Sequence, residues 1–403
     1  MQFDFESIMD RRGHDAMALD ALGLGHGSAP EKPEEGFDAI PMWVADMNFP
    51  TAPSITAALE ERIRHPAYGY FLTSPEYYDA IVRWHVTRHG VEGLSRRHIG
   101  YENGVLGGLV SALSACAERG SPVLLHSPTY IGFTGAIENA GYRIVLSPLK
   151  RDEAGVWRMD YGDMDEKLEE EGAKVAVFCS PHNPCGRVWE RWEIERAMEV
   201  YASHGCTVVS DEIWSDLVMP GHVHVPTQSV SEDARRRTVA LYAPSKTFNL
   251  AGLVGSYHVI YDDELRSRVE MEGSRSRYNS MNVLSMHALV GAYSDEGAAW
   301  VDELVSVLDG NIAFACDWIE EHFEGVSAFR PEGSYMLFLD CGGWLEKTGR
   351  SLDELLREGW RVGVCWQDGR PFHGPTHIRM NLALPRSRVE EAFRRLSEHV
   401  FGS

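Results

Sequence analysis

Short apolar runs alternate with amphipathic segments through the middle of the chain. The runs are rich in valine, isoleucine and leucine, which is typical of buried strands. They occupy residues 122–128, 142–149, 175–181, 206–213, 238–245 and 253–261. Between them, apolar residues at helical spacing predict helices at 105–120, 131–141 and 193–205. This alternation predicts an α/β fold with a mainly parallel sheet that helices cover on both faces.

The two ends of the chain follow other patterns. Residues 1–50 are irregular because glycines and prolines interrupt any period, and the first helices are predicted at 53–65 and 76–90. A helical pattern over 298–323 predicts one long helix that joins two domains. After it, strands and helices that indicate an α+β unit are predicted at 334–341, 352–359, 362–367, 377–384 and 388–400.

These patterns divide the chain into three parts. We predict an arm with part of the small domain at 1–48, a large domain at 49–291, and a small C-terminal domain at 292–403 that includes the linking helix. A chain of 403 residues is too long for one ordinary core, so two domains agree with its length.

Charge and cysteine content narrow the range of partners and locations. The formal net charge of −22 makes nucleic acid and anionic membrane surfaces poor partners. No run reaches the ~20 apolar residues that a membrane-spanning helix needs. The seven cysteines form no C-x-x-C pair, so reduced and mostly buried thiols are expected. Since the N-terminus has no basic-then-apolar pattern, we expect a cytoplasmic location.

Polar residues follow three of the predicted strands. Asn183 comes after the strand at 175–181, Asp211 ends the next strand, and Lys246 follows the strand at 238–245. Because the carboxyl ends of parallel strands meet at one edge of a sheet, these three side chains are expected to lie together. A lysine, an acid and an amide donor in one place suit an electrophilic aromatic cofactor. Taken singly, each also fits a structural role, such as a surface lysine, a capping carboxylate or an Asn-Pro turn.

The segments around these residues resemble a known family. HNPCGRVW, SDEIWSDL and APSKTFNLAGL are similar to the class I/II aminotransferase superfamily, fold type I of the pyridoxal-phosphate enzymes. WVADMNFP at 43–50 and DRRG at 10–13 resemble the cystathionine β-lyase-like branch, the MalY/PatB-type C–S lyases. The resemblance runs over nearly the whole chain. It implies a seven-stranded sheet in the large domain, pyridoxal 5′-phosphate as cofactor, an amino-acid substrate and a homodimer.

The resemblance also implies the roles of four residues. Lys246 would carry the cofactor as a Schiff base and move the substrate α-proton. Asp211 would pair with the pyridine nitrogen and keep it protonated, and Asn183 would donate to the phenolic oxygen of the ring. Arg379, in HIRMNLALPR, would grip the substrate α-carboxylate with two parallel hydrogen bonds, for which a structural ion pair is the alternative.

The phosphate and the ring faces are assigned in the same way. Gly104 opens a loop, and the amides of Val105 and Leu106 at the start of a helix would form the phosphate cup, since helix N-termini bind anions. Tyr130 matches the aromatic residue that stacks on the ring, and we include it among the catalytic residues. Tyr70 matches a tyrosine that reaches the phosphate across the dimer interface. Packing is the alternative for both tyrosines.

Two positions depart from the family pattern. Ala243 stands where many relatives have a serine three residues before the lysine, so one phosphate contact is missing or moved, although Ser245 can still supply a hydroxyl. Trp214 stands where many aminotransferases have a tyrosine that donates to the ring oxygen. An indole N–H can donate, but its shape differs. Trp214 is therefore a candidate cofactor-binding residue and weakens the case for a standard aminotransferase.

A metal site is not expected. His222 and His224 in GHVHVP have the spacing of metal ligands on a strand, but no cysteine, aspartate or glutamate completes a site nearby in the sequence. The same segment, GHVHVP, resembles a loop of the lyase branch.

Three functions fit these observations. The leading hypothesis is β-elimination at a carbon–sulfur bond, which converts cystathionine, cysteine or a related S-conjugate into a thiol, pyruvate and ammonia. An aminotransferase that uses the same cofactor is the alternative, since both reactions begin with loss of the α-proton. A regulatory protein–protein role of a cofactor-binding protein is a third possibility.

Overall fold

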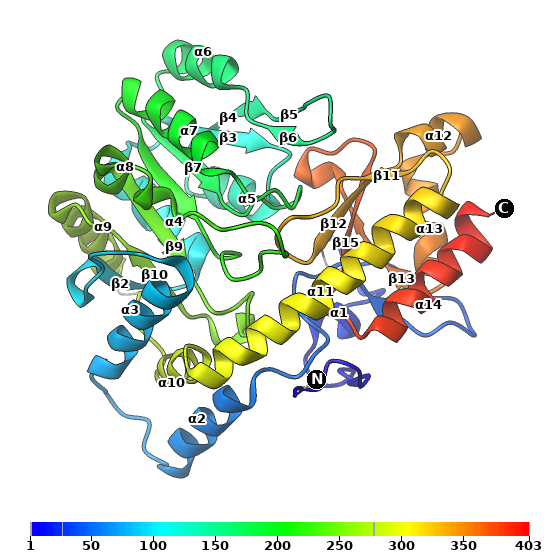
Figure 1. Ribbon diagram of the computed structural model, residues 1–403, viewed down its shortest axis with the longest axis horizontal. Coiled ribbons are helices and arrows are strands. Elements are labelled where there is room, and N and C mark those ends of the chain that lie inside the picture. The colour runs from blue at the N-terminus through cyan, green and yellow to red at the C-terminus, as the bar shows by residue number, and fades with distance from the viewer. Residues whose placement is uncertain (1, 26, 277–278, 403) are drawn as a thin grey trace.

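The computed structural model describes residues 2–25, 27–276 and 279–402, and a seven-stranded sheet forms its larger part (Figure 1). The strand order is β2-β10-β9-β8-β7-β3-β4. Strands β4, β3, β7, β8 and β9 are parallel, whereas β10 runs antiparallel to both of its neighbours. Their bounds are β2 Ile99–Glu102, β3 Pro122–Ser127, β4 Arg143–Pro148, β7 Val175–Cys179, β8 Thr207–Asp211, β9 Thr238–Tyr242 and β10 Ser256–Val259. The predicted mainly parallel sheet is confirmed.

Helices cover both faces of this sheet because successive strand residues point to opposite sides. On one face, Val123 and Leu125 pack with α4 (Val105–Cys116), α5 (Ile131–Asn139) and α9 (Asp263–Ser276). On the other face, Leu124 and Phe178 pack in one cluster with residues of α6 (Tyr161–Glu171), α7 (Arg191–Ser203) and α8 (Glu232–Arg237). A short hairpin, β5 (Lys150–Arg151) with β6 (Trp157–Arg158), follows β4.

The C-terminal part of the chain forms a smaller α+β unit. Its antiparallel sheet has the order β11-β12-β15-β14, and its helices are α12, α13 and α14. The bounds are β11 Ser327–Ala328, β12 Met336–Asp340, β14 Gln367–Asp368, β15 His377–Asn381, α12 Gly342–Thr348, α13 Leu352–Arg361 and α14 Arg386–Leu396. The strand predicted at 362–367 is divided in two. Its first half, β13 (Val364–Cys365), pairs with β1 (Ile40–Pro41), and its second half pairs with β15.

The N-terminal arm packs against this smaller unit. Besides the β1–β13 pair, the amide of Asn48 donates to the carbonyl of Ala383 at 2.9 Å. The arm includes the short helix α1 (Met17–Asp20), whose Ala18 carbonyl accepts from the Trp43 indole at 3.0 Å. Beyond the arm, α2 (Pro53–Arg64) and α3 (Pro75–His89) contact α10 (Val283–Ala292) beside the large sheet.

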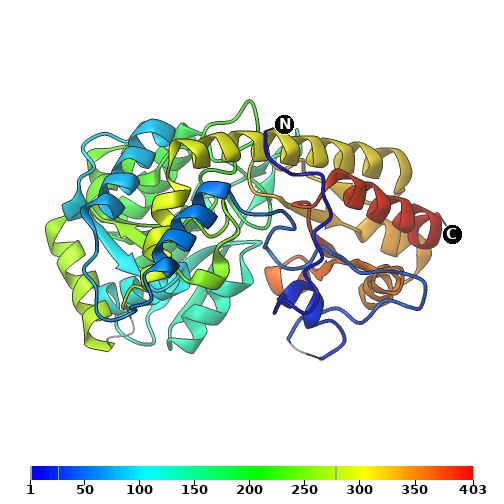
Figure 2. The ribbon, with the colours of Figure 1, turned by 90° about the horizontal axis from the view of Figure 1, so that it is seen from below.

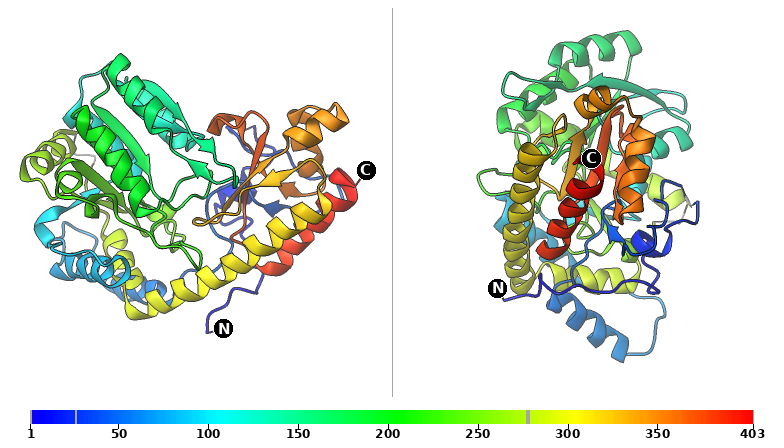
Figure 3. Two further views of the ribbon diagram at one scale, coloured as in Figure 1. Left: turned by 45° about the horizontal axis from the view of Figure 1, so that its top comes forward. Right: turned by 90° about the vertical axis from the view of Figure 1, so that its right-hand side faces the viewer.

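One long helix, α11 (Asp295–His322), connects the two parts, as the sequence predicts. It begins beside α2 and α10 and ends beside α14, and it spans the molecule in Figures 2 and 3. Its buried face includes Trp300, Leu304, Leu308 and Ile312. The boundaries at 48 and 291 remain our proposed division of the chain.

Two further observations concern the chain as a whole. The seven cysteines are unpaired, and all except Cys116 and Cys316 are buried. Within the described ranges, no helix is both long and apolar enough to cross a membrane.

Candidate active site

A cavity of about 230 Å³ opens at the carboxyl ends of the parallel strands. The segments that follow β3, β7, β8 and β9 line it, together with the start of α4. Nine of the eleven sequence-predicted site residues lie in its wall: Gly104, Val105, Leu106, Tyr130, Asn183, Asp211, Trp214, Ser245 and Lys246. Arg379 contacts one of these residues, since its guanidinium donates to the side-chain oxygen of Asn183. Tyr70 lines a separate surface pocket. Asn183, Asp211 and Lys246 therefore lie together at the carboxyl ends of the parallel strands, as the sequence predicts.

Asp211 ends β8 and is almost completely buried. Burial raises the pKa of its carboxyl to about 7, although the backbone N–H of Ile213 donates to Oδ1 at 3.0 Å and opposes the shift. The raised pKa means that the hydrogen bond does not offset the full cost of burying the negative charge. The carboxylate is therefore prepared to pair with a cationic N–H.

Lys246 follows β9, and its Nζ donates to the carbonyl of Ala45 at 2.8 Å. Burial and the positive charge of Arg379 together lower the pKa of the amine to about 8, although Asp46 and Asp211 oppose the shift. The amine also lies 5.8 Å from the centre of the Trp214 ring. At neutral pH such an amine exchanges its proton far more readily than an exposed lysine does.

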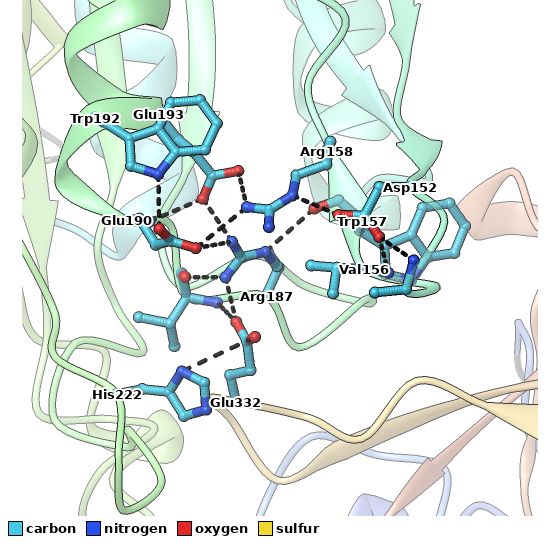
Figure 4. A network of polar contacts seen from close by, with 12 residues as sticks. Asp152, Val156, Trp157, Arg158, Arg187, Glu190, Trp192, Glu193, His222 and Glu332 are labelled. Atoms are coloured by element: carbon cyan, nitrogen blue, oxygen red, sulfur yellow. Dashed lines mark hydrogen bonds and ion pairs between the residues drawn. The ribbon is translucent and has the colours of Figure 1, made fainter.

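Asn183 lies in a tight loop after β7 that a buried ion network anchors (Figure 4). Arg187 closes the loop, since its carbonyl accepts from the amide of His182 at 2.8 Å. The guanidinium of Arg187 pairs with Glu193 of α7 at 2.5 Å and with Glu332, which precedes β12. The two carboxylates balance the buried charge, so the loop has a fixed geometry and is tied to the smaller unit.

Arg379, in β15, is buried without a carboxylate partner among the described residues. Its guanidinium donates to the amide oxygens of Gln367 at 2.5 Å and Asn183 at 3.4 Å, and to the carbonyl of Trp43 at 3.2 Å. Its Nε is buried and has no hydrogen-bond partner in the described part of the chain. Burial lowers the pKa to about 10, which still leaves the group protonated at neutral pH. The structural ion pair that was the alternative is therefore not what the geometry shows.

The start of α4 forms another part of the cavity wall. Gly104 has φ of +80°, which an L side chain rarely adopts, and its N-cap position offers no side chain from the described part of the chain to cap the helix. The N–H groups of Val105 and Leu106 lie in the first turn, where no intrahelical acceptor exists. Such an end attracts an anion. Ser245 lies in the same wall.

Tyr130 comes directly before α5 and is half-buried in the cavity wall. A Cβ on Gly132 would lie only 2.3 Å from Cε1 of the tyrosine ring. The absence of a side chain at 132 therefore gives the ring its room. Burial raises the pKa of the phenol, and Arg379 opposes this shift.

Tyr70 does not contribute to the cavity of its own chain. Its side chain is fully exposed, and so is most of Leu72. The segment lies near Ser280 and Met281, with which it lines a shallow surface pocket.

The two histidines of GHVHVP are also separate from the cavity. His224 is buried and pairs with Glu212 at 2.8 Å, whereas His222 is exposed and lies 3.9 Å from Glu332. No group of three side chains suited to a metal ion occurs in the described part of the chain.

Several residues of the site could not be found from their sequence signals. The carbonyl of Ala45 serves Lys246 through its backbone, which no residue type reveals. Gln367 contacts Arg379 only because β14 lies beside β15. Arg187 is different, because it directly follows the recognisable HNPCG segment and that motif was a signal for it.

Comparison with known proteins identifies the family. The sequence profile described as "Aminotransferase class I and II" matches residues 44–396. The chain belongs to the class I and II aminotransferase family. "Cystathionine beta-lyase PatB" of Bacillus subtilis (strain 168) is 33% identical over 395 residues, which is 98% of each chain. "Protein MalY" of Escherichia coli (strain K12) is 30% identical over 396 residues, which is 96% of each chain.

Solved structures of the family agree. Cystalysin from Treponema denticola, whose structure contains pyridoxal 5′-phosphate, has a TM-score of 0.89 at 27% identity and covers 99% of this chain and 98% of its own. The pyridoxal-phosphate-bound C–S lyase from Staphylococcus hominis has a TM-score of 0.88 at 26% identity with the same coverage. These findings confirm the resemblance and the fold type expected from the sequence.

Proposed function

We propose that this family member is a pyridoxal-phosphate-dependent C–S β-lyase. It would convert cystathionine, cysteine or a related S-conjugate into a thiol, pyruvate and ammonia. The observation that carries the proposal is the similarity over 98% of the chain to a cystathionine beta-lyase, combined with a cavity that brings Lys246, Asp211 and Asn183 together. The roles of these side chains are part of the proposal.

The cavity has the donor set that pyridoxal phosphate requires. The uncapped start of α4, with Gly104, Val105 and Leu106, would hold the phosphate together with Ser245. Asp211 would pair with the protonated pyridine nitrogen, whose positive N–H would stabilise the buried negative charge of the carboxylate. Because the oxygen of the Asn183 amide accepts from Arg379, its NH₂ group stays available to donate to the ring oxygen. Tyr130 and Trp214 would pack on the cofactor.

When bound, pyridoxal phosphate supplies a carbonyl that captures the substrate amine and a ring that accepts the electron pair released at Cα. Lys246 would hold the cofactor covalently in the resting enzyme. With a pKa of about 8, the freed amine would then accept the α-proton. Arg379 would hold the α-carboxylate and so fix the orientation of the bond that breaks.

The leaving group decides the outcome after the α-proton is lost. A thiolate at Cβ is a weak base, since an ordinary thiol has a pKa of about 8.5, and it can therefore depart without a strong acid beside it. The aminoacrylate that remains hydrolyses to pyruvate and ammonia in water. The site thus needs no further catalytic group for elimination.

The proposal includes a homodimer in the cytoplasm. The exposed Tyr68, Tyr70 and Leu72 form an apolar segment that a second copy would cover. In such a dimer Tyr70 would reach the neighbouring cavity and contact the phosphate. The seven unpaired cysteines support a reducing compartment.

Transamination is the second candidate. The family profile and a relative named "Probable aspartate/prephenate aminotransferase" from Aquifex aeolicus (strain VF5), 26% identical over 374 residues, favour it. We expect it as a slow side reaction, because the same lysine could return the proton to the cofactor. A regulatory protein–protein role has no observation of its own.

The proposal is tested with purified wild-type and Lys246→Ala proteins. The wild type is expected to be yellow, to lose its absorption band on borohydride reduction, and to form pyruvate and a thiol from L-cystathionine. The variant should form no covalent cofactor adduct on borohydride reduction and no pyruvate. A Lys246→Ala protein to which borohydride still fixes the cofactor covalently would show that another residue carries it.

A further inference from the structure

The charge of Arg379 is solvated by neutral oxygens alone. Among the described residues, every acceptor within hydrogen-bond distance is an amide or a peptide carbonyl, from Gln367, Asn183 and Trp43. The ring of Phe372 covers one face of the guanidinium at 4.3 Å. A buried arginine is usually paired with a carboxylate, because an unpaired charge in the interior is costly. The arrangement therefore keeps one positive charge unneutralised inside the protein.

Gln367 makes the shortest of these contacts. It lies in β14 directly opposite Arg379 in the antiparallel register, and its Oε1 accepts from Nη2 at 2.5 Å. The side chain is almost completely buried. Its Nε2 faces the hydroxyl of Ser28 in the N-terminal arm at 3.4 Å, which fixes the amide with its oxygen toward the arginine. Backbone pairing and the arm together hold this acceptor in place.

We propose that Gln367 is a positioning residue that orients Arg379 while leaving its charge free for the α-carboxylate of the substrate. The inference rests on the proposed function in that it takes Arg379 as the carboxylate-binding group. A glutamate at 367 would have the same shape but would form an ion pair with Arg379 inside the protein. The substrate carboxylate would then have to compete with a carboxylate that is already present. A neutral acceptor avoids this competition.

The test measures how well the site distinguishes an acid from its amide. The probes are L-alanine and L-alaninamide, which carry no leaving group at Cβ, and binding to the holoenzyme is followed by the rapid change in cofactor absorption. The proteins are the wild type, Gln367→Glu and Gln367→Met. Methionine has a similar volume without charge or a strong acceptor, so it separates the loss of orientation from the loss of free charge. Thermal unfolding and the cofactor spectrum report on folding.

We expect Gln367→Glu to weaken binding of L-alanine by about 10- to 100-fold, while binding of L-alaninamide changes less than about threefold. Gln367→Met should weaken L-alanine binding less and keep the preference for the acid. If Gln367→Glu weakens both probes equally, or if the acid preference survives, the inference is wrong. Should the glutamate variant fail to fold, loss of the acid preference in Gln367→Met would likewise contradict it. Since neither probe can eliminate, the result does not depend on lyase activity.

Discussion

Hydrogen-bond partners decide how burial shifts the pKa of single residues at the cavity. Asp211 and Glu212 are neighbours and both are buried, but their carboxyl groups shift in opposite directions. His224 and Tyr242 hydrogen-bond to Glu212 and lower its pKa, whereas Asp211 has one backbone donor and its pKa rises to about 7. The difference supports our proposal that Asp211 binds the cofactor ring, whereas Glu212 has a structural role.

The raised pKa of Asp211 predicts a pH-dependent cost in the cofactor-free protein. The folded chain binds this proton more tightly than the unfolded chain, so the stabilisation is complete below the ordinary value of 3.8 and is lost as pH rises through about 7. Asp211→Asn lacks this loss. We expect the cofactor-free variant to exceed the wild type in unfolding free energy by a few kcal/mol at pH 8 and by much less near pH 4. Urea unfolding at several pH values measures the difference.

The same variant should retain the cofactor but lose most of its turnover, because a neutral amide cannot keep the pyridine nitrogen protonated. Near-normal turnover would show that Asp211 is not the partner of the ring, and a stability difference that does not change with pH would contradict the raised pKa of Asp211.

Gly132 provides a second prediction about a single residue. A methyl group there would collide with the Tyr130 ring. We expect Gly132→Ala to weaken cofactor binding by about 3- to 10-fold, which is the range of one displaced aromatic contact. Gly135→Ala in the same helix is the control, because a Cβ there meets nothing within 4 Å. Equal affinities of the two variants for pyridoxal phosphate would exclude a stacking role of Tyr130.

At the scale of elements, the segment 332–335 directly before β12 connects the large-sheet part with the smaller unit, and we call it the strap. The amide of Glu332 donates to the carbonyl of Gly186, its carbonyl accepts from Met219, and its side chain pairs with Arg187. Tyr335, just beyond, packs edge-on against Trp214 at 4.8 Å. The strap thus links the loop of Asn183 to the strand that lies beside Arg379.

Removing the negative charge of Glu332 should destabilise the protein. Glu332→Gln leaves Arg187 with Glu193 as its remaining buried partner, and we expect a loss of about 3 kcal/mol in unfolding free energy. Glu190→Gln is the matched control, since the side chain of Glu190 is about half exposed and its pair with Arg187 is long, at 3.4 Å. There the loss should stay below about 1 kcal/mol. Similar melting temperatures for both variants would contradict the structural role of Glu332.

Elements with strong periodicity could be predicted from the sequence, and those defined by tertiary pairing could not. The long helix α11 and the buried strands β7, β8 and β9 follow from apolar spacing alone. The division of 362–367 into β13 and β14 depends on which partner strand each half meets, and the sequence does not encode this locally. For the same reason Lys246 could be predicted from its motif, while its contact with Ala45 could not.

For the molecule as a whole, the main proposal is that two copies of the chain form a homodimer. A segment with Tyr70 and Leu72 almost fully exposed is unusual for a chain that functions alone. Its exposure also explains why Tyr70 is absent from the cavity of its own chain.

We therefore predict that Leu72→Glu weakens a homodimer. The dissociation constant measured by sedimentation should rise about 30-fold or more, and cofactor affinity should fall with it, because each site would lose Tyr70 of its neighbour. Val223→Glu, at another exposed apolar position, should leave the assembly unchanged. A wild-type protein that is monomeric and fully active would rule out the shared site.

The most direct measurement compares elimination with transamination on one preparation of the wild-type protein. Pyruvate and thiol release from L-cystathionine and L-cysteine is followed beside amino-group exchange between an amino acid and 2-oxoglutarate. We predict that elimination is faster by about tenfold or more, a barrier difference of about 1.4 kcal/mol. If neither sulfur substrate yields pyruvate while the amino acid and the oxo acid exchange rapidly, the protein is an aminotransferase and the lyase proposal is wrong.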